Sequence, residues 1–371
     1  MPQPIAPSVA YRIDEGGGRR LGEIVANIRR NPGRMIRPNE FDELSGRLDV
    51  GGVLRQLPAG MSEDDFIGIL KLTMLTECAT ETFAAAIEGN ACRYSAPWLY
   101  SFTHDVWTPD ELTHATPYKQ ILLGLGFEEA ELDREIRATR ARSLDHRSGD
   151  TPMHLTTYGM LSEYATDKWH GAIWRILRDP CPSAAYMVAR VKRRETFHRV
   201  WYRDMTAAQI ASNPDLARYV AEVMLTFRMP GASLVPELQK EAGRWLKLMQ
   251  WDFQHAAREL GRMLEEVLGD PGRLGRLLIG VAAERGERFG PLRAQQLLAV
   301  LEHLRGAGYS LVGEAFLESV GLDYLVGIEN ETETGLPATL PVRARNLVRT
   351  WLASRIQFDL PAKLTQRETM P

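Results

Sequence analysis

The sequence predicts an all-α fold in which helices pack around a shared core. Apolar residues recur at helical spacing along almost the whole chain, whereas the alternation of apolar and polar residues that is typical of strands is nearly absent. Helix start signals agree with this periodicity, since Ser62 precedes an acidic first turn and Pro109 follows Thr108 at a favoured first helical position. The 371 residues are enough to bury a sizeable core.

The apolar periodicity also gives the order of the elements. We expect helices over 18–31, 62–89, 109–124, 128–144, 152–178, 182–211, 214–228, 234–268, 271–286, 291–307, 310–321 and 340–356. Pro180 and Pro182 separate two long helices, and Pro230-Gly231 ends the segment that follows them. The chain therefore divides into an N-terminal arm and helix at 1–61, a central bundle at 62–231 and a C-terminal helical region at 232–371 that completes the domain.

The composition excludes several classes of protein. Lys plus Arg number 45 and Asp plus Glu number 48, so the positive field of a nucleic-acid binder is missing. No apolar stretch reaches the roughly 18 residues that a membrane span needs, and residues 1–18 contain no run of signal-peptide type. The three cysteines form no C-x-x-C pair, which favours a reducing compartment. We therefore expect a cytoplasmic protein without nucleic-acid partners.

Two Glu-x-x-His sequences are the strongest chemical signal, and each follows another glutamate of a predicted helix. The residues are Glu77, Glu111 and His114 in the first set and Glu163, Glu195 and His198 in the second. The lone glutamate precedes its motif by 34 residues in the first set and by 32 in the second. Residues three apart share a helix face, so the carboxylate and imidazole of each motif can reach one ion.

This set of carboxylates and imidazoles is the ligand pattern of ferritin-like di-iron and di-manganese proteins. Carboxylates offset the charge of two divalent ions, bridge them, and change coordination as the metals change oxidation state. Buried carboxylates without metal would be very costly. Periodicity alone leaves Glu81 as an alternative to Glu77. The sequence therefore predicts a ferritin-like helical bundle with a di-iron or di-manganese core and additional C-terminal helices.

Four short segments carry the motifs of a known enzyme family. Met-Leu-Thr-Glu at 74–77 looks like the family's Met-Ile-Thr-Glu, and Trp-Thr-Pro-Asp-Glu-Leu-Thr-His at 107–114 is similar to its Trp-Thr-x-Glu-Glu-Asn-Arg-His. Glu-Tyr-Ala-Thr at 163–166, with His170-Gly171 downstream, matches Glu-Arg-Ala-Thr with its downstream His-Gly. Arg-Glu-Thr-Phe-His at 194–198, followed by Tyr202, looks like Asp-Glu-Lys-Arg-His with its downstream Tyr.

Over about residues 62–231 the sequence thus resembles the soluble acyl-carrier-protein desaturases, the stearoyl-type enzymes of plastids and their actinobacterial relatives. The resemblance selects Glu77 over Glu81 as the first ligand. It implies a ferritin-like homodimer with two iron ions as cofactor, O2 as co-substrate and ferredoxin as the electron donor. Such an enzyme removes two hydrogens from an acyl chain that is bound as a thioester to acyl-carrier protein.

The resemblance also implies roles for individual residues. All six residues of the two sets become iron ligands, with Glu111 and Glu195 as the bridging carboxylates. Thr166 becomes a catalytic hydroxyl on the oxygen-binding side of the cluster, although a hydrogen bond to a backbone carbonyl of its own helix is the alternative. Trp107 and Tyr202 are either redox-active or packing aromatics, and we expect packing.

The sequence departs from the family at an electron path. Arg194 stands where the family has an Asp that orients a histidine ligand and connects to an N-terminal Trp, and no Trp precedes Trp98. We therefore expect another electron route. An acidic carrier protein would dock on basic residues. The candidate groups are Arg19 with Arg20, Arg29 and Arg30 with Arg34, and Arg190, Lys192, Arg193 and Arg194.

The alternatives to desaturation belong to three classes. A di-iron hydroxylase or oxygenase that acts on an unusual acyl or aminoacyl substrate would use the same oxidant, and the missing electron path favours it. A ferritin-like protein would bind metal without turning over an organic substrate. A metal-free helical interaction protein would need all six candidate ligands to be coincidental. Metal content separates this last class from the others.

Overall fold

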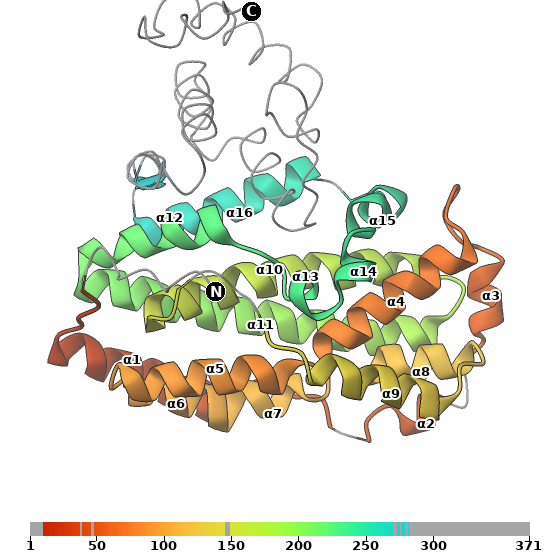
Figure 1. Cartoon of the computed structure of the whole chain (residues 1–371), viewed down its shortest axis with the longest axis horizontal. Coiled ribbons are helices and arrows are strands. Elements are labelled where there is room, and N and C mark those ends of the chain that lie inside the picture. Colours follow the sequence, from red (N-terminus) through yellow and green to blue (C-terminus); the bar gives the residue numbers. More distant parts are fainter. Residues whose placement is uncertain are drawn as a thin grey trace, which may run out of the picture.

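Helices make up the fold of this computed structural model (Figure 1). The structure describes residues 10–37, 39–45, 48–144, 149–251, 253–269, 273–274, 277–278 and 281. No strand occurs in this part of the chain, so the predicted all-α, ferritin-like bundle is confirmed. The predicted helices 291–307, 310–321 and 340–356, and most of 271–286, lie outside the described residues.

Two long helices, α10 (Pro152–Leu177) and α11 (Pro182–Ser212), form the centre of the bundle and pack along each other. Thr151 caps α10 by accepting a hydrogen bond from the N–H of His154. A Cβ at Gly159 of α10 would lie 2.7 Å from the ring of Tyr202 on α11, so the glycine permits this close contact. Both helices agree with the ranges predicted from the sequence.

The first half of the bundle is interrupted where single helices were predicted. The expected helix 62–89 is two helices, α4 (Glu63–Glu77) and α5 (Thr80–Arg93). At the break, the Thr80 hydroxyl donates to the Glu77 carbonyl and Arg140 Nε donates to the Cys78 carbonyl, so side chains satisfy groups that a continuous helix would pair. The prediction of one helix here was wrong.

The expected helix 109–124 is interrupted as well. The chain forms α6 (Pro97–Phe102), a π-helical turn at Thr103–Trp107 and α7 (Thr108–Glu111), and after a turn it continues as α8 (Thr116–Gly124). Pro117 cannot lie in a helix interior, but it fits the first turn of α8. The helix therefore restarts just before this proline, and His114 lies in the turn.

The remaining N-terminal and connecting helices surround this core. They are α1 (Glu15–Arg30), α2 (Asp42–Ser45), α3 (Val50–Leu54) and α9 (Glu129–Arg140). Asp14 caps α1, which packs against α6 and α11. The predicted helices 18–31 and 128–144 correspond to α1 and α9.

The segment after α11 covers the bundle with shorter helices. The structure has a 3-10 turn at Pro214–Leu216, α12 (Ala217–Thr226), α13 (Gly231–Leu234), α14 (Pro236–Gln239), α15 (Ala242–Leu248) and α16 (Phe253–Leu268). The single helix expected at 234–268 was wrong, because Pro236 holds Val235 outside the helical region and Gln250 adopts a positive φ of 53°. None of the described helices is both long and apolar enough to cross a bilayer.

Candidate metal centre

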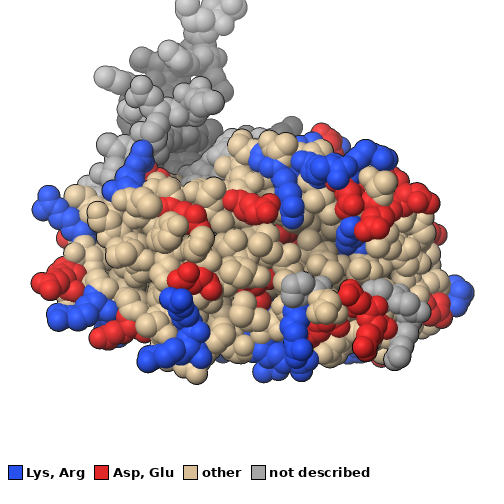
Figure 2. Space-filling view, turned by 90° about the horizontal axis from the view of Figure 1, so that it is seen from below, with Lys and Arg blue, Asp and Glu red and all other residues tan. Residues whose placement is uncertain are grey.

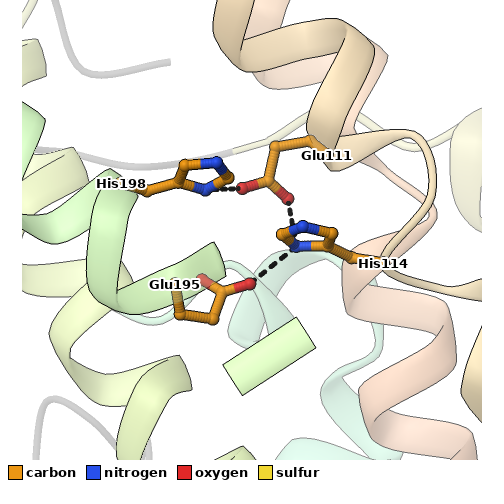
Figure 3. A group of neighbouring side chains, drawn as sticks. All are labelled: Glu111, His114, Glu195 and His198. Carbon is orange, nitrogen blue, oxygen red and sulfur yellow. Dashed lines mark ion pairs between the residues drawn. The ribbon is translucent and has the colours of Figure 1, made fainter. Parts of the chain in front are cut away.

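Four predicted ligands meet in the middle of the bundle (Figure 3). They are Glu111, His114, Glu195 and His198, and their ligand atoms all lie within 4.8 Å of one another. Glu111 ends α7 and His114 follows in the turn, whereas the other two project from one face of α11. All four side chains are buried.

Glu111 lies between the two histidines. Its Oε1 is 2.7 Å from His198 Nδ1, and its Oε2 is 3.2 Å from His114 Nδ1. Glu195 approaches from α11, with Oε1 2.7 Å from His114 Nδ1. The two imidazole rings are nearly parallel, with centroids 5.3 Å apart. Each Nδ1 therefore faces the carboxylates at the centre of the cluster.

A second group adjoins the first and consists of Glu77, His170 and Glu195. Glu77 Oε1 lies 3.1 Å from His170 Nε2, and Glu195 is common to both groups. Glu81, the alternative to Glu77, has a side chain that is 55% exposed and pairs with Arg140. The tertiary structure thus places Glu77 at the centre and Glu81 on the surface.

Glu163, the sixth predicted ligand, lies beside the cluster and belongs to neither group. Its Oε2 is 3.8 Å from His198 Nδ1, and its Oε1 accepts a hydrogen bond from Trp107 Nε1 at 3.1 Å. Trp107 is buried and also packs against Tyr202. This tryptophan thus has a second contact besides packing, since it holds one oxygen of Glu163.

Thr166 lies one turn after Glu163, with its hydroxyl at the edge of the centre. Oγ1 donates to Glu195 Oε2 at 2.8 Å. It also lies 3.2 Å from the Ser162 carbonyl and 3.3 Å from the Glu163 carbonyl. Both contacts considered from the sequence, one toward the cluster and one within the helix, are therefore present.

The buried polar atoms of the centre fit a bound metal. Four ligand atoms that face the centre have no hydrogen-bond partner among the described residues: Glu111 Oε1, His114 Nδ1, Glu195 Oε1 and His198 Nδ1. Leaving such atoms buried without a partner costs about 1–3 kcal/mol each. Divalent cations would satisfy all of them, and a set of carboxylates and imidazoles suits iron or manganese.

Burial and mutual repulsion change the proton affinity of these groups. Burial, with the nearby charges of Glu163 and Glu111, raises the pKa of Glu195 to about 8. Burial opposes ionisation of Glu111 too, but His114 and His198 lower its pKa below the usual range. Burial likewise opposes protonation of both histidines, yet Glu111 raises their pKa values. Protons thus offset part of the negative charge of the cluster, and a bound metal would replace them.

Sequence reasoning gave no role to two residues that contact the ligands. Asp110 accepts hydrogen bonds at Oδ2 from His198 Nε2, at 2.7 Å, and from Arg194 Nε, at 2.6 Å. A carboxylate on the far nitrogen fixes the ring so that Nδ1 faces the centre. His170 is the second such residue. The sequence signals for these two roles were positional. Asp110 directly precedes Glu111, and His170 follows Glu163 by seven residues, which places it on the same helix face.

Two arginines of one candidate docking surface are buried, so this part of the prediction was wrong. Arg190 and Arg194 are buried, and they pair with Glu40 and Asp110. They therefore offer no charge to a partner. On the face shown in Figure 2, Lys and Arg are interspersed with Asp and Glu and do not form one basic patch. The basic candidates that remain exposed are Arg19, Arg20, Arg29, Arg30, Arg34 and Arg193.

Two pockets reach the centre and share Thr76, Glu77 and Thr166. Each has about 490 Å³ of space between its lining residues, a volume that includes space open to solvent. The other residues of the first pocket are Leu72, Thr73, Ala165, Trp169, Met229, Gln239, Ala242, Leu246 and Trp251. Four predicted ligands line the second pocket, and most of its other lining side chains are apolar, among them Phe83 and Leu234. An apolar molecule in either pocket would lie beside the metal centre.

Comparison with known proteins agrees with this geometry. Residues 48–260 match the family described as fatty acid desaturase, and this match covers more than half of the 371 residues. A comparison with curated proteins found no match. The chain belongs to the fatty acid desaturase family.

Proposed function

We propose that this protein is an O2-dependent di-iron oxidase that introduces a double bond into an acyl chain bound to acyl-carrier protein. The observation that carries the proposal is the opening of two largely apolar pockets onto a buried cluster of carboxylates and imidazoles. Family membership supports the same reaction class. We also propose that a ferredoxin supplies the electrons and that the protein is a homodimer, as in the enzymes that the sequence resembles.

The predicted ligands would bind the two iron ions: Glu77, Glu111, His114, Glu163, Glu195 and His198. When bound, such a pair supplies an oxidant strong enough for an unactivated C–H bond, a task that no side chain performs. The protein residues hold this centre in place. Asp110 fixes the ring of His198, Trp107 holds Glu163, and Thr166 directs a hydroxyl at Glu195.

The pockets would position the acyl chain. The first pocket, with Leu72, Trp169 and Leu246 in its wall, suits the hydrocarbon end. Thr76 and Thr166, which line both pockets, mark the point where a chain passes closest to Glu77. Exclusion of bulk water by apolar walls protects a reactive oxidant from side reactions.

Docking of an acidic carrier protein is proposed for the exposed arginines of α1. Arg19, Arg20 and Arg30 are exposed, whereas Arg29 pairs with Asp105 at 3.3 Å. Surface charges of this kind act mainly on association and are weakened by salt. We therefore expect carrier binding to weaken as ionic strength rises.

The experiment that tests the function loads the full-length protein with Fe(II) under anaerobic conditions and measures bound iron per chain. Acyl-carrier substrate, ferredoxin with its reductase, and O2 are then added, and products are identified by mass spectrometry. Loss of two hydrogens from the acyl group supports the proposal. A product that gains an oxygen atom would assign hydroxylation instead, and iron binding without any acyl product would favour a metal-binding protein.

A further inference from the structure

We propose that His170 is a seventh ligand of the metal centre and binds through Nε2 beside Glu77 and Glu195. This inference rests on the proposed function, because it requires metal at the cluster. His170 projects from α10, two helical turns after Glu163, on the same face. It lies outside the two Glu-x-x-His sequences, so the ligand set would exceed the duplicated pattern of the sequence.

Distances around His170 Nε2 are those of neighbouring ligands of one ion. Glu77 Oε1 is 3.1 Å away and Glu195 Oε1 is 3.7 Å away. One ligand atom from each of the three residues falls within 4.8 Å of the others. The imidazole is completely buried, so bulk solvent does not reach this nitrogen.

The direction of Nε2 separates a ligand from a hydrogen-bond donor. Glu77 Oε1 is close, yet Nε2 forms no hydrogen bond with any described residue. His114 Nδ1 likewise lies close to a carboxylate oxygen, Glu195 Oε1 at 2.7 Å, without forming a hydrogen bond. Two groups that bind one cation direct their lone pairs at the ion and not at each other. His170 Nε2 thus resembles the predicted ligand nitrogens in its geometry.

His154, another buried histidine of α10, provides the contrast. Its Nε2 lies 3.2 Å from Glu222 Oε2, nearly the same separation, and there the two groups do form a hydrogen bond. His154 belongs to neither cluster of potential ligands. Distance from a carboxylate therefore does not distinguish these two histidines, but the direction of the ring nitrogen does.

The other nitrogen of His170 is held in a way that suits metal binding. Nδ1 contacts the hydroxyl of Tyr118, and the two rings stack with centroids 5.5 Å apart. When Nδ1–H donates to Tyr118 Oη, the lone pair of Nε2 is left to face the centre. Metal-binding histidines commonly have such a partner on the far nitrogen. Tyr118 would thus fix the ring orientation of His170, as Asp110 fixes that of His198.

The test is proton NMR of full-length protein loaded with Co(II), which shifts the N–H signals of coordinated imidazoles far from the normal range. We expect three shifted signals that exchange with solvent deuterium in the wild-type protein. His170→Gln should show two, with metal affinity lower by tenfold or more, the scale on which even supporting residues act. The matched control, His154→Gln, should retain three.

A second variant keeps the inference testable if His170→Gln does not fold. Tyr118→Phe keeps the stacked ring but removes the acceptor for Nδ1–H, so it should move one of the three signals and leave the others in place. Bound cobalt with only two signals in the wild-type protein would overturn the seventh ligand and leave the proposed function intact. Absence of bound metal in the wild-type protein would overturn both.

Discussion

Arg194 Nε donates a hydrogen bond to Asp110 Oδ2 at 2.6 Å, and the same oxygen lies 2.7 Å from His198 Nε2. The arginine is completely buried, and its guanidinium lies 4.9 Å from the ring centre of Phe197 and 5.2 Å from that of Trp201. Burial opposes ionisation of Asp110, but the neighbouring His198 and Arg194 lower its pKa to about 2. Arg194 is therefore connected to the predicted ligand His198 through this carboxylate.

Replacement of Arg194 by Met should destabilise the metal-free protein by about 3 kcal/mol, because Asp110 would remain buried without its guanidinium partner. Adding Asp110→Asn should restore part of the loss, since the uncompensated charge is then gone. The free energy of unfolding in urea measures both effects. An Arg194→Met protein as stable as wild type would show that the pair contributes nothing net.

Glu77→Gln should reduce bound iron, because the amide cannot supply a negative oxygen to the centre. Glu81→Gln should bind iron as the wild type does, since Glu81 is on the surface beside Arg140. Elemental analysis after anaerobic Fe(II) loading compares the two. Equal iron content in both variants would remove Glu77 from the ligand set.

Thr166→Val should retain iron but slow acyl turnover by about 100-fold, the lower end of the range for loss of a positioned proton donor or acceptor. The hydroxyl donates to Glu195 Oε2, and valine has the same shape without that donor. Thr166→Ser should recover most of the rate. Wild-type rates in Thr166→Val, with iron bound, would leave only the intrahelical role for this hydroxyl.

The metal-free protein should lose stability as pH rises from about 6 to 8. Burial and the neighbouring carboxylates raise the pKa of Glu195 to about 8, so the folded state retains a proton that the unfolded state has released. The raised pKa values of His114 and His198 act in the same direction above their ordinary range. Bound iron replaces these protons, so the iron-loaded protein should show a smaller decline. Thermal unfolding at several pH values measures the difference, and a metal-free protein that gains stability over this range would contradict it.

Ala242→Phe should shift the preference of the enzyme toward shorter acyl chains. Ala242 is buried in the wall of the first pocket, where a phenyl ring would occupy space that we assign to the hydrocarbon end. Ala79→Phe fills the second pocket and serves as the comparison. The ratio of kcat/KM values for long and short substrates is the measurement, and an unchanged ratio in Ala242→Phe would reject this assignment.

The sequence by itself determined the helical class, the two long helices and the residue types of the centre. Periodicity and prolines are local signals, so 152–178 and 182–211 were predicted almost to the residue. The spacing of Glu195 and His198 on an uninterrupted helix likewise determines that they share a face. Local rules suffice wherever a helix continues.

Only the tertiary structure decided where helices stop and which side chains meet. The breaks after Glu77 and Glu111 depend on hydrogen bonds and packing from other segments, such as Arg140 on the Cys78 carbonyl. The approach of His170 to Glu77 and of Arg194 to Asp110 joins residues 93 and 84 positions apart in the chain. Periodicity cannot reveal such contacts, because it describes one helix at a time, whereas the centre is made where several helices pack together.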